Sequence, residues 1–600
     1  MSTTTFSNLV EMQESARKRF ASLNLFGTKV DGSWQWLTYE EFGKQVDNFR
    51  SALLAKGVSK GDKVAVISDN RVEWAIGAYG SFGVGAWYVP TYEATLPKEW
   101  HFILEDSGTR ILLCSRKEIY EKVRGFVDEV PSLEAVYCFE LPEDHPDSFK
   151  ALLKLGEASP APTVALEEED IACLIYTSGT TGKPKGVMLS HGNIISNVNA
   201  VQKIFPMREE DCSLSFLPWA HSFGQTCELH CMMNMGATVA IAESVPKLMD
   251  NLGEVRPTLL FSVPRIFNRI YDGLQKKMAD ESPVKRFMFN KGLDVARQRR
   301  LLRDQGKRSA LLDWQYGIFD KLVFSKVRER LGGRLKYAFS GGAALAREVG
   351  EFIDDMGIVV FEGYGLTETS PVATANYPDN QKIGTIGKPI PGIEIHICDE
   401  EQKVLGDEQD GEIVVVGPNV MQGYYNRPDA TAEVIFDLNG KRAFRTGDMG
   451  RRGKDGFIRI TGRFKEQYKL ENGKYVSPSP LEEQLKLSGF IVQACIYGFN
   501  KPYNVAVIVP DFEALIKWAT DEGISDTSPE ALVANPRVMA KIEQEVDHYG
   551  HEFKAYEKPQ RLLLVAEDFT PENDLLTPTL KLKRRNVIAL YEQQIQSLYA

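Results

Sequence analysis

Long apolar runs are missing from this sequence. No stretch approaches the roughly 20 consecutive apolar residues that a membrane-spanning helix needs, so the sequence predicts a protein that is soluble or attached only to a membrane surface. The first residues do not resemble a secretory signal, because Glu11 and Glu14 stand beside Arg17 and Arg19. We therefore expect a cytoplasmic protein.

Cysteine is scarce and scattered, and several of the eight cysteines lie within apolar runs. This pattern is typical of small buried thiols in a reducing compartment rather than of a disulfide framework. Cys227 and Cys231 lie near His221 and His230, but the paired short spacing of a zinc site is missing. We interpret these four residues as core residues.

An excess of positive charge is also missing. The chain has 71 lysines and arginines against 82 acidic residues, a net charge of −11, which argues against a general affinity for nucleic acid. No internal repeat or low-complexity tract stands out. The 600 residues, 43% of them hydrophobic, are enough for more than one domain with a substantial core.

Alternating strand and helix patterns fill the chain to about residue 460. Short apolar segments at 63–68, 111–114 and 259–263 predict strands, and 70–79 predicts an amphipathic helix capped by Asn70. Closely spaced strands follow Gly392, at 393–397, 412–416 and 457–460. The polar stretch 461–467 then separates this body from a tail with strands and helices of its own.

A loop rich in glycine and hydroxyl groups lies at 176–186. It contains three glycines, four aliphatic hydroxyls and two lysines, but it is not a Walker A loop, because Pro184 disfavours helix at Lys183. Apolar segments on both sides predict that it joins two strands and cradles phosphates. Its candidate nucleotide-binding residues are Thr177, Ser178, Gly179, Thr180, Thr181, Gly182, Lys183 and Lys185, and the division of labour between the two lysines is open.

A second motif, at 361–368, combines groups that suit a nucleotide. Tyr364 offers a ring that can stack on a purine, Thr367 a hydroxyl for a phosphate, and Glu368 a carboxylate of the kind that binds Mg²⁺ beside phosphates. A solvated turn explains Glu368 but not Tyr364 or Gly365. Asp448, in a Thr-Gly-Asp turn, can accept hydrogen bonds from vicinal hydroxyls or can form a simple Asx turn.

These motifs together resemble the acyl-adenylate-forming enzymes, which include acyl-CoA synthetases, luciferases and adenylation domains of peptide synthetases. The resemblance implies that Tyr364 stacks on adenine, Thr367 touches the α-phosphate, and Glu368 binds magnesium and, with Thr367 and Lys581, is catalytic. It further implies that Lys465 is the hinge and that Lys581, or else Lys583, is the adenylation lysine. The other nucleotide contacts that it implies are Gly341, Gly342, Ala343, Glu362, Gly363, Gly365, Asp448 and Arg463.

The resemblance also implies a fold and a domain organisation. We expect a large domain of layered α/β sheets over 1–464, with a β-rich subdomain at about 392–462, and a small mobile α+β domain over 465–600. Trp219, His221, Phe223 and Gly473 match the family's channel for the acyl chain and CoA. A buried aromatic turn is the alternative for the residues at 219–223.

Segments at 256–267, 283–331 and 471–477 are similar to the long-chain fatty acyl-CoA synthetase branch. The resemblance implies ATP-dependent ligation of a long-chain fatty acid to CoA, with Mg²⁺ as cofactor and with AMP and pyrophosphate as products. Three alternatives are open. The acyl group could go to a carrier protein, the carboxylate could be medium-chain or aromatic, or the protein could be a non-catalytic lipid-binding relative.

A basic helical insertion within residues 283–331 differs in charge from the rest of the chain. Between 285 and 330 there are 13 basic and five acidic residues, a difference of +8, and aromatic residues are interleaved. A solvated helical face over core aromatics is the simpler interpretation. The alternative is peripheral contact with an anionic membrane.

Overall fold

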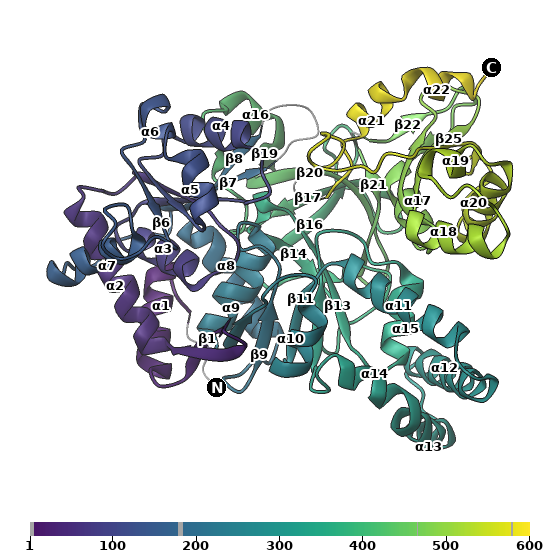
Figure 1. Ribbon diagram of the computed structural model, residues 1–600, viewed down its shortest axis with the longest axis horizontal. Coiled ribbons are helices and arrows are strands. Elements are labelled where there is room, and N and C mark those ends of the chain that lie inside the picture. Colours follow the sequence, from purple (N-terminus) through teal and green to yellow (C-terminus); the bar gives the residue numbers. More distant parts are fainter. Residues whose placement is uncertain (1–4, 178–183, 465, 578–579) are drawn as a thin grey trace. The chain divides into compact units, whose positions relative to one another are not determined.

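The computed structural model describes residues 5–177, 184–464, 466–577 and 580–600 (Figure 1). The chain forms two compact units, one comprising 1–396 with 414–446 and the other 397–413 with 447–600. It passes between them within strands β16 (Glu394–Cys398), β17 (Asp410–Val416) and β20 (Lys441–Arg452). The predicted boundary near residue 465 stays a prediction.

Two mixed sheets form the frame of the first unit. Most of their neighbouring strands are parallel, including β3 with β4 and β5, and β12 with β11 and β13, as expected for short apolar strands covered by helices. One sheet has the order β18 (Gly423–Tyr424), β8 (Lys185–Ser190), β7 (Ile171–Thr177), β4 (Trp87–Thr91), β3 (Lys63–Ile67), β5 (Ile111–Cys114), β6 (Ala135–Cys138). The other has the order β15 (Lys388–Pro389), β14 (Val372–Ala375), β13 (Val360–Gly365), β12 (Tyr337–Ser340), β11 (Leu259–Ser262), β9 (Cys212–Ser215), β10 (Thr238–Ile241), β1 (Asn24–Val30), β2 (Ser33–Thr38).

Helices connect these strands, as the α/β pattern predicts. In chain order they are α1 (Leu9–Phe20), α2 (Tyr39–Ala55), α3 (Val72–Gly83), α4 (Pro97–Ser107), α5 (Lys117–Val123), α6 (Phe126–Glu129), α7 (Phe149–Ala158), α8 (His191–Ile204), α9 (Cys231–Asn234), α10 (Leu248–Val255), α11 (Pro264–Ala279), α12 (Pro283–Asp304), α13 (Ala310–Phe319), α14 (Ser325–Arg330), α15 (Arg347–Asp355) and α16 (Pro428–Val434). Two π-helices, η1 (Phe223–His230) and η2 (Asp320–Phe324), and the 3₁₀ turn η3 (Thr367–Thr369) complete this unit. No described helix is both long and apolar enough to cross a membrane.

A smaller α+β arrangement makes up most of the second unit. Its central sheet has the order β24 (Ile491–Tyr497), β25 (Asn504–Pro510), β26 (Pro559–Leu564). A short hairpin of β22 (Tyr468–Lys469) and β23 (Tyr475–Val476) precedes it. The helices are α17 (Pro478–Leu485), α18 (Phe512–Asp521), α19 (Pro529–Val533), α20 (Pro536–Tyr549), α21 (Arg584–Leu590) and α22 (Glu592–Ser597).

The predicted β-rich region is present. Strands β16, β17, β20 and β19 (Ile435–Leu438) pair in that order, and β21 (Ile458–Arg463) pairs with β20. The interpretation of 461–467 as a separating stretch is wrong for its first three residues, because Thr461, Gly462 and Arg463 continue β21. Hydrogen bonding to β20 outweighs the polar composition of this segment.

The predicted cap at Asn70 is also wrong. Helix α3 begins at Val72 without a side-chain cap, and the Asn70 amide instead donates to Ser215 Oγ at 3.1 Å and to the Leu217 carbonyl at 2.7 Å. A tertiary partner therefore replaces the local one that the sequence suggested.

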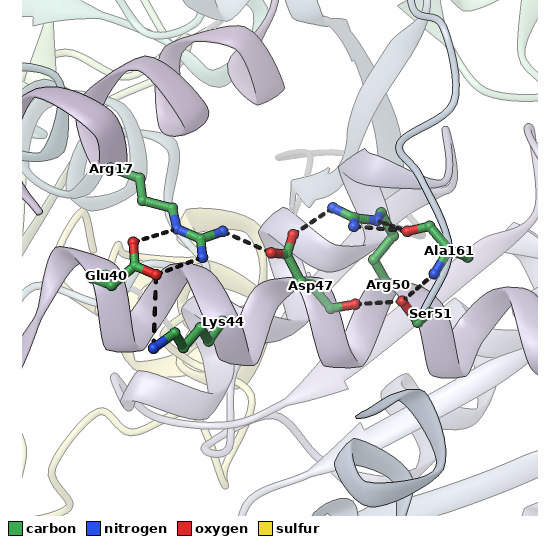
Figure 2. Close-up of polar contacts among 7 residues, drawn as sticks. All are labelled: Arg17, Glu40, Lys44, Asp47, Arg50, Ser51 and Ala161. Carbon is green, nitrogen blue, oxygen red and sulfur yellow. Dashed lines mark hydrogen bonds and ion pairs between the residues drawn. The ribbon is translucent and has the colours of Figure 1, made fainter. Parts of the chain in front are cut away.

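A polar network fastens the N-terminal helices to the segment that leads into β7 (Figure 2). Arg17 on α1 contacts Glu40 at 2.9 Å and Asp47 at 2.6 Å on α2, and Asp47 in turn pairs with Arg50 at 2.7 Å. The Arg50 guanidinium donates to the Ala161 carbonyl at 2.8 Å. Planar bidentate contacts of this kind fix geometry well, so the network holds α1 and the segment around Ala161 to α2.

Three of the four residues interpreted as core residues lie in the core, whereas His221 is half-buried. Cys227, Cys231 and His230 are buried, and all eight thiols are free. The Tyr79 hydroxyl is 2.6 Å from His230 Nδ1. Burial lowers the pKa of His230 to about 3, so this ring is neutral at physiological pH.

Candidate active site

The carboxyl ends of β12 and β13 bring two predicted motifs together. The strands are parallel and Ser340 is opposite Glu362, so the turn after β12 and the end of β13 share one edge of the sheet. The Leu345 amide donates to Glu362 Oε1 at 3.2 Å across this edge. Gly341, Gly342 and Ala343 therefore lie beside the strand that carries Glu362, Gly363 and Tyr364.

Glu362 is a desolvated carboxyl. Burial raises its pKa to about 7, although hydrogen bonds from the Leu345 and Gly384 amides lower it. A carboxyl with this pKa exchanges its proton near neutral pH and can therefore act as either a hydrogen-bond donor or an acceptor.

Two glycines permit close contacts at this edge. A Cβ atom on Gly365 would lie 1.8 Å from the Pro371 carbonyl oxygen, and one on Gly341 would lie 3.2 Å from the Phe223 ring. Gly365 is thus required where β13 meets β14. Gly341 places the turn after β12 against the start of η1.

Thr367 and Glu368 belong to the turn η3, which follows β13. Thr367 Oγ1 lies 3.4 Å from Ser222 Oγ, which joins this turn to the His221–Phe223 segment. Glu368 Oε1 accepts a hydrogen bond from the Tyr424 hydroxyl at 2.9 Å. Lys185 Nζ lies 5.0 Å from the centre of the Tyr424 ring, a distance typical of a cation–π contact.

Tyr424 is a residue of this site that the sequence reasoning missed. Strand β18 places it there by pairing with β8, with Tyr424 opposite Val187. Burial, together with the Glu368 carboxylate, raises the pKa of Tyr424 well above its ordinary value, so its hydroxyl stays a donor. The Tyr424-Tyr425 aromatic pair was the available signal, but it has no meaning without the strand pairing.

The prediction that the glycine-rich loop joins two strands is confirmed. Strands β7 and β8 are antiparallel neighbours with Thr177 opposite Lys185. The candidate residues Ser178, Gly179, Thr180, Thr181, Gly182 and Lys183 lie outside the described residues, so their roles stay predictions. Lys185 is the loop lysine whose contact with Tyr424 the structure describes.

The predicted channel segment divides into two parts. Trp219 is buried between Phe26 and Trp74, with ring centres 5.8 and 5.7 Å away, which is the packing role given above as the alternative. His221 and Phe223 are only half-buried, and the Phe223 amide donates to His221 Nδ1 at 3.2 Å. These two residues lead directly into η1.

A buried chain of hydrogen bonds connects η1 to the segment around Trp219. Glu228 on η1 accepts a hydrogen bond from Ser215 Oγ at 2.6 Å, and Ser215 accepts one from Asn70 at 3.1 Å. Asn70 Oδ1 also accepts from the Trp219 amide at 2.8 Å. The sequence reasoning missed Glu228, because a lone carboxylate in an apolar helix carries no local signal.

The ionisation of Glu228 makes the stability depend on pH. Burial raises its pKa from 4.5 to about 7, so the folded protein keeps a proton that the unfolded chain loses above pH 4.5. Stability therefore falls as the pH rises from about 4.5 to about 7, by a total of about 3 kcal/mol from this group. We expect Glu228→Gln to be more stable than wild type at pH 8, with the advantage disappearing near pH 5.

Thermal unfolding midpoints measured from pH 5 to pH 8 check this expectation. Asp521→Asn, at the end of α18, is the control, because its carboxyl is exposed and should leave the pH profile unchanged. Parallel profiles for wild type and Glu228→Gln would contradict the assignment.

In the second unit, Asp448 and Arg463 face each other. They are opposite residues of β20 and β21, and Arg463 Nε lies 3.2 Å from Asp448 Oδ1. Gly447, at φ +71°, donates its amide to Glu412 Oε1 at 3.0 Å. The pairing of β20 with β21 thus holds the buried Asp448 carboxylate beside a guanidinium.

The two candidate adenylation lysines have different surroundings. Lys583 Nζ forms an ion pair with Asp574, and Lys583 directly precedes α21. Lys581 is exposed, and its backbone closes a turn in which the Thr577 amide donates to the Lys581 carbonyl at 2.8 Å. Lys583 therefore stabilises the local structure at the start of α21 through its ion pair with Asp574.

Arg584, at the start of α21, is not a surface residue. Its guanidinium is largely buried and contacts Glu482 at 2.6 and 2.7 Å. Lys465, the predicted hinge, lies outside the described residues. Gly473 has φ +82° in the turn between β22 and β23, where a residue without a side chain is favoured.

Comparison with known families covers most of the chain. The AMP-binding enzyme family matches residues 13–425, and its C-terminal domain family matches 465–600. The chain belongs to the AMP-binding enzyme family. The resemblance to the adenylate-forming enzymes is thus confirmed.

Relatives within this family are similar over nearly the whole of this chain. The chain is 32% identical to long chain acyl-CoA synthetase 7, peroxisomal, of Arabidopsis thaliana, covering 98% of this chain and 85% of the relative. It is also 32% identical to a long-chain-fatty-acid–CoA ligase of Mycobacterium tuberculosis, covering 95% and 93%.

Solved structures agree on the fold. The adenylation domain of a carboxylate reductase from Mycobacterium chelonae matches with a TM-score of 0.79 at 22% identity, over 99% of this chain and 91% of that one. An anthranilate CoA ligase in complex with anthranoyl-AMP matches with a TM-score of 0.74 at 20% identity, over 98% of both chains. The predicted adenylate-forming fold is confirmed.

Proposed function

We propose that this AMP-binding enzyme is an ATP-dependent long-chain fatty acid–CoA ligase. It activates the carboxylate as an acyl-adenylate, releases pyrophosphate, and then transfers the acyl group to CoA with release of AMP. The similarity to long-chain ligases over nearly the whole chain supports this proposal. The observation that carries it in the structure is the Lys185, Tyr424 and Glu368 cluster beside Thr367.

The first half-reaction needs no general base on the enzyme. A fatty acid carboxylate, with a pKa near about 4.5, is already ionised at pH 7 and can attack the α-phosphorus directly. The barrier comes from crowded negative charge, so positive groups and hydrogen-bond donors aimed at the phosphates lower it. We assign this task to Lys183 or Lys185, Thr367 and Lys581.

The remaining nucleotide contacts follow from the predicted roles. Tyr364 stacks on adenine, and Glu362 accepts a hydrogen bond from the adenine amino group. Asp448 accepts hydrogen bonds from the ribose hydroxyls. Arg463, paired with Asp448 at 3.2 Å, orients that carboxylate. We assign the hinge between the half-reactions to Lys465.

Glu368 is the residue that would hold magnesium. Mg²⁺ commonly takes one or two carboxylates together with substrate phosphates, and the hydrogen bond from Tyr424 to Glu368 Oε1 keeps one carboxylate in a defined orientation at η3. This donor set fits the ion. When bound, the ion supplies charge neutralisation at the phosphates.

Thioester formation follows in the same enzyme. A simple thiol has a pKa of about 8.5, so a modest lowering makes the CoA thiolate available at neutral pH. We assign His221, Phe223 and Gly473 to the path of the acyl chain and CoA. Trp219, buried between Phe26 and Trp74, supports that path from the core.

The proposed location is the cytoplasm, with peripheral contact at a membrane surface through the basic insertion at 285–330. The proposed partners are the small-molecule substrates fatty acid, ATP and CoA. No binding to nucleic acid is proposed, because the net charge of the chain is −11.

Pyrophosphate release with a panel of carboxylates tests the function. We expect release with saturated acids of about C12 to C18, little release with C4 or aromatic acids, and acyl-CoA formation only when CoA is present. A preference for aromatic acids, or AMP release that requires a carrier protein and ignores free CoA, would favour the other adenylating functions. Absence of carboxylate-dependent pyrophosphate release would favour a lipid-binding protein.

A further inference from the structure

Helix α13 and the following η2 carry an exposed apolar stripe. Its residues are spaced by three or four along the helix and therefore lie on one face. They are Leu311, Trp314, Ile318 and Leu322, with exposed fractions of 63, 65, 40 and 48%. Single exposed apolar side chains are ordinary, but a continuous stripe of large ones marks an interaction surface.

The fold itself does not use this stripe. The inner side of α13 already packs on its neighbours, since Tyr316 lies 5.8 Å from the Phe324 ring and Arg299 lies 4.6 Å above the Tyr316 ring. No residue of α13 is buried. The expectation of a solvated face over core aromatics is therefore wrong for Trp314 and also for Phe287, which is 66% exposed on α12.

Acidic residues near the stripe are neutralised within the insertion. Asp313 pairs with Arg299 at 2.7 Å and Asp320 with Arg328 at 2.6 Å. Several exposed basic residues of α12 to α14 and their connections have no ion pair with any described residue. They are Arg286, Lys291, Arg297, Lys307, Arg308, Lys321, Lys326 and Arg330.

Two other arginines of the insertion serve the fold instead. Arg300 is buried and pairs with Asp355 at 2.8 Å, and Arg303 pairs with Asp354 at 2.8 Å. These contacts hold α12 against α15, and Figure 1 shows α12, α13 and α15 as neighbouring helices. Charge reversal at Arg299, Arg300 or Arg303 would therefore disturb the fold as well as any surface function.

We infer that the stripe Leu311, Trp314, Ile318 and Leu322 seats the protein on an anionic phospholipid bilayer, with Lys307, Arg308 and Lys321 beside the lipid headgroups. An amphipathic helix of this kind lies in the interface, with its apolar face at the boundary between headgroups and acyl chains. Tryptophan favours that boundary because its ring is apolar and its N–H polar.

Charge favours a membrane over a second copy of this chain. A two-fold dimer through the stripe would place the same basic insertion on both sides of the interface. The exposed basic residues that have no ion pair with any described residue would then repel their counterparts. An anionic bilayer is complementary instead. The inference rests on the proposed function, because docking on a bilayer would bring the enzyme to a long-chain fatty acid that partitions into that bilayer.

Vesicle flotation of the full-length protein without ATP, CoA or fatty acid tests the inference. We expect binding to vesicles of phosphatidylcholine with 30% phosphatidylglycerol, and at least tenfold weaker binding to phosphatidylcholine alone or at high salt. The double variant Leu311→Ala, Trp314→Ala and the double variant Lys307→Glu, Arg308→Glu should each lose at least tenfold in affinity.

Matched control variants test whether the loss of vesicle binding is specific to the stripe or follows from removing any exposed aromatic residue or reversing any surface charges. Phe499→Ala removes an exposed aromatic side chain of the second unit, and Lys117→Glu, Lys122→Glu reverses two exposed charges on α5. Both should float like wild type. Vesicle binding that is absent, insensitive to salt, or unchanged in the stripe variants overturns the inference, as does a wild-type dimer that the stripe variants dissociate without any vesicle binding.

The outcome is distinguishable from failure of the proposed function. Flotation needs no catalysis, whereas pyrophosphate release from ATP with dodecanoic acid as the carboxylate, measured without vesicles, needs no membrane. The stripe variants should keep that release within about twofold of wild type. Intact flotation with no carboxylate-dependent release would refute the ligase but leave the docking surface standing.

Discussion

Lys581→Ala is expected to lose fatty-acid-dependent pyrophosphate release by a factor on the order of 100 to 1000, the usual effect of removing one group that stabilises transition-state charge. Thioester formation from supplied acyl-AMP should remain, because the phosphate displacement that needs this cation has already taken place. The measurement is pyrophosphate release for the first half-reaction and acyl-CoA formation from acyl-AMP for the second.

Lys583→Ala is the matched control for this lysine. It removes the same charge two residues away, but Lys583 is ion-paired with Asp574 and its loss should change pyrophosphate release less than about threefold, as for a partly exposed ion pair. A large loss in Lys583→Ala with a normal Lys581→Ala would show that the lysine assignment is reversed.

Glu368→Gln is expected to reduce pyrophosphate release by a factor on the order of 100 and to raise the magnesium concentration needed for half-maximal rate. The substitution keeps the shape of the side chain and its hydrogen bond from Tyr424 but removes the charge that favours a divalent cation. A magnesium titration of the initial rate, at saturating ATP and fatty acid, measures both effects.

Two further variants define what the carboxylate does. Tyr424→Phe removes only the hydrogen bond to Glu368 Oε1, so we expect a loss of roughly 10- to 100-fold, the usual range for a hydrogen bond to a charged group. Glu433→Gln removes an exposed carboxylate of α16 and should leave the rate unchanged. An unaltered magnesium dependence in Glu368→Gln would exclude this residue as the metal ligand.

Strands and their order of appearance were the most predictable part of this protein. The segments around 63–68, 111–114 and 259–263 are strands in the structure, because a short apolar run bounded by polar residues is a local property that survives in almost any packing. The loop at 176–186 was likewise predictable as a connection between two strands, since glycine and proline act on the backbone at their own positions.

Partners of polar side chains were much less predictable. Asn70 has the residue type of a helix cap, yet its amide contacts Ser215 and Leu217. Arg584 has the residue type of a surface cation, yet it is paired with Glu482. In both cases a residue distant in sequence offers a better partner than the nearby backbone or water. The neighbouring sequence does not indicate which distant residue this partner is.

The amino-acid order alone specified the residue types of the nucleotide motifs, the α/β class and the positive charge of the insertion, because these depend on composition and short-range pattern. Strand register and packing decided that Tyr424 meets Glu368, that Ser222 meets Thr367, and that Trp314 is exposed while Trp219 is buried. Such contacts join segments up to 145 residues apart. Their formation depends on the pairing of β18 with β8 and of β12 with β13, which brings distant residues within hydrogen-bonding distance.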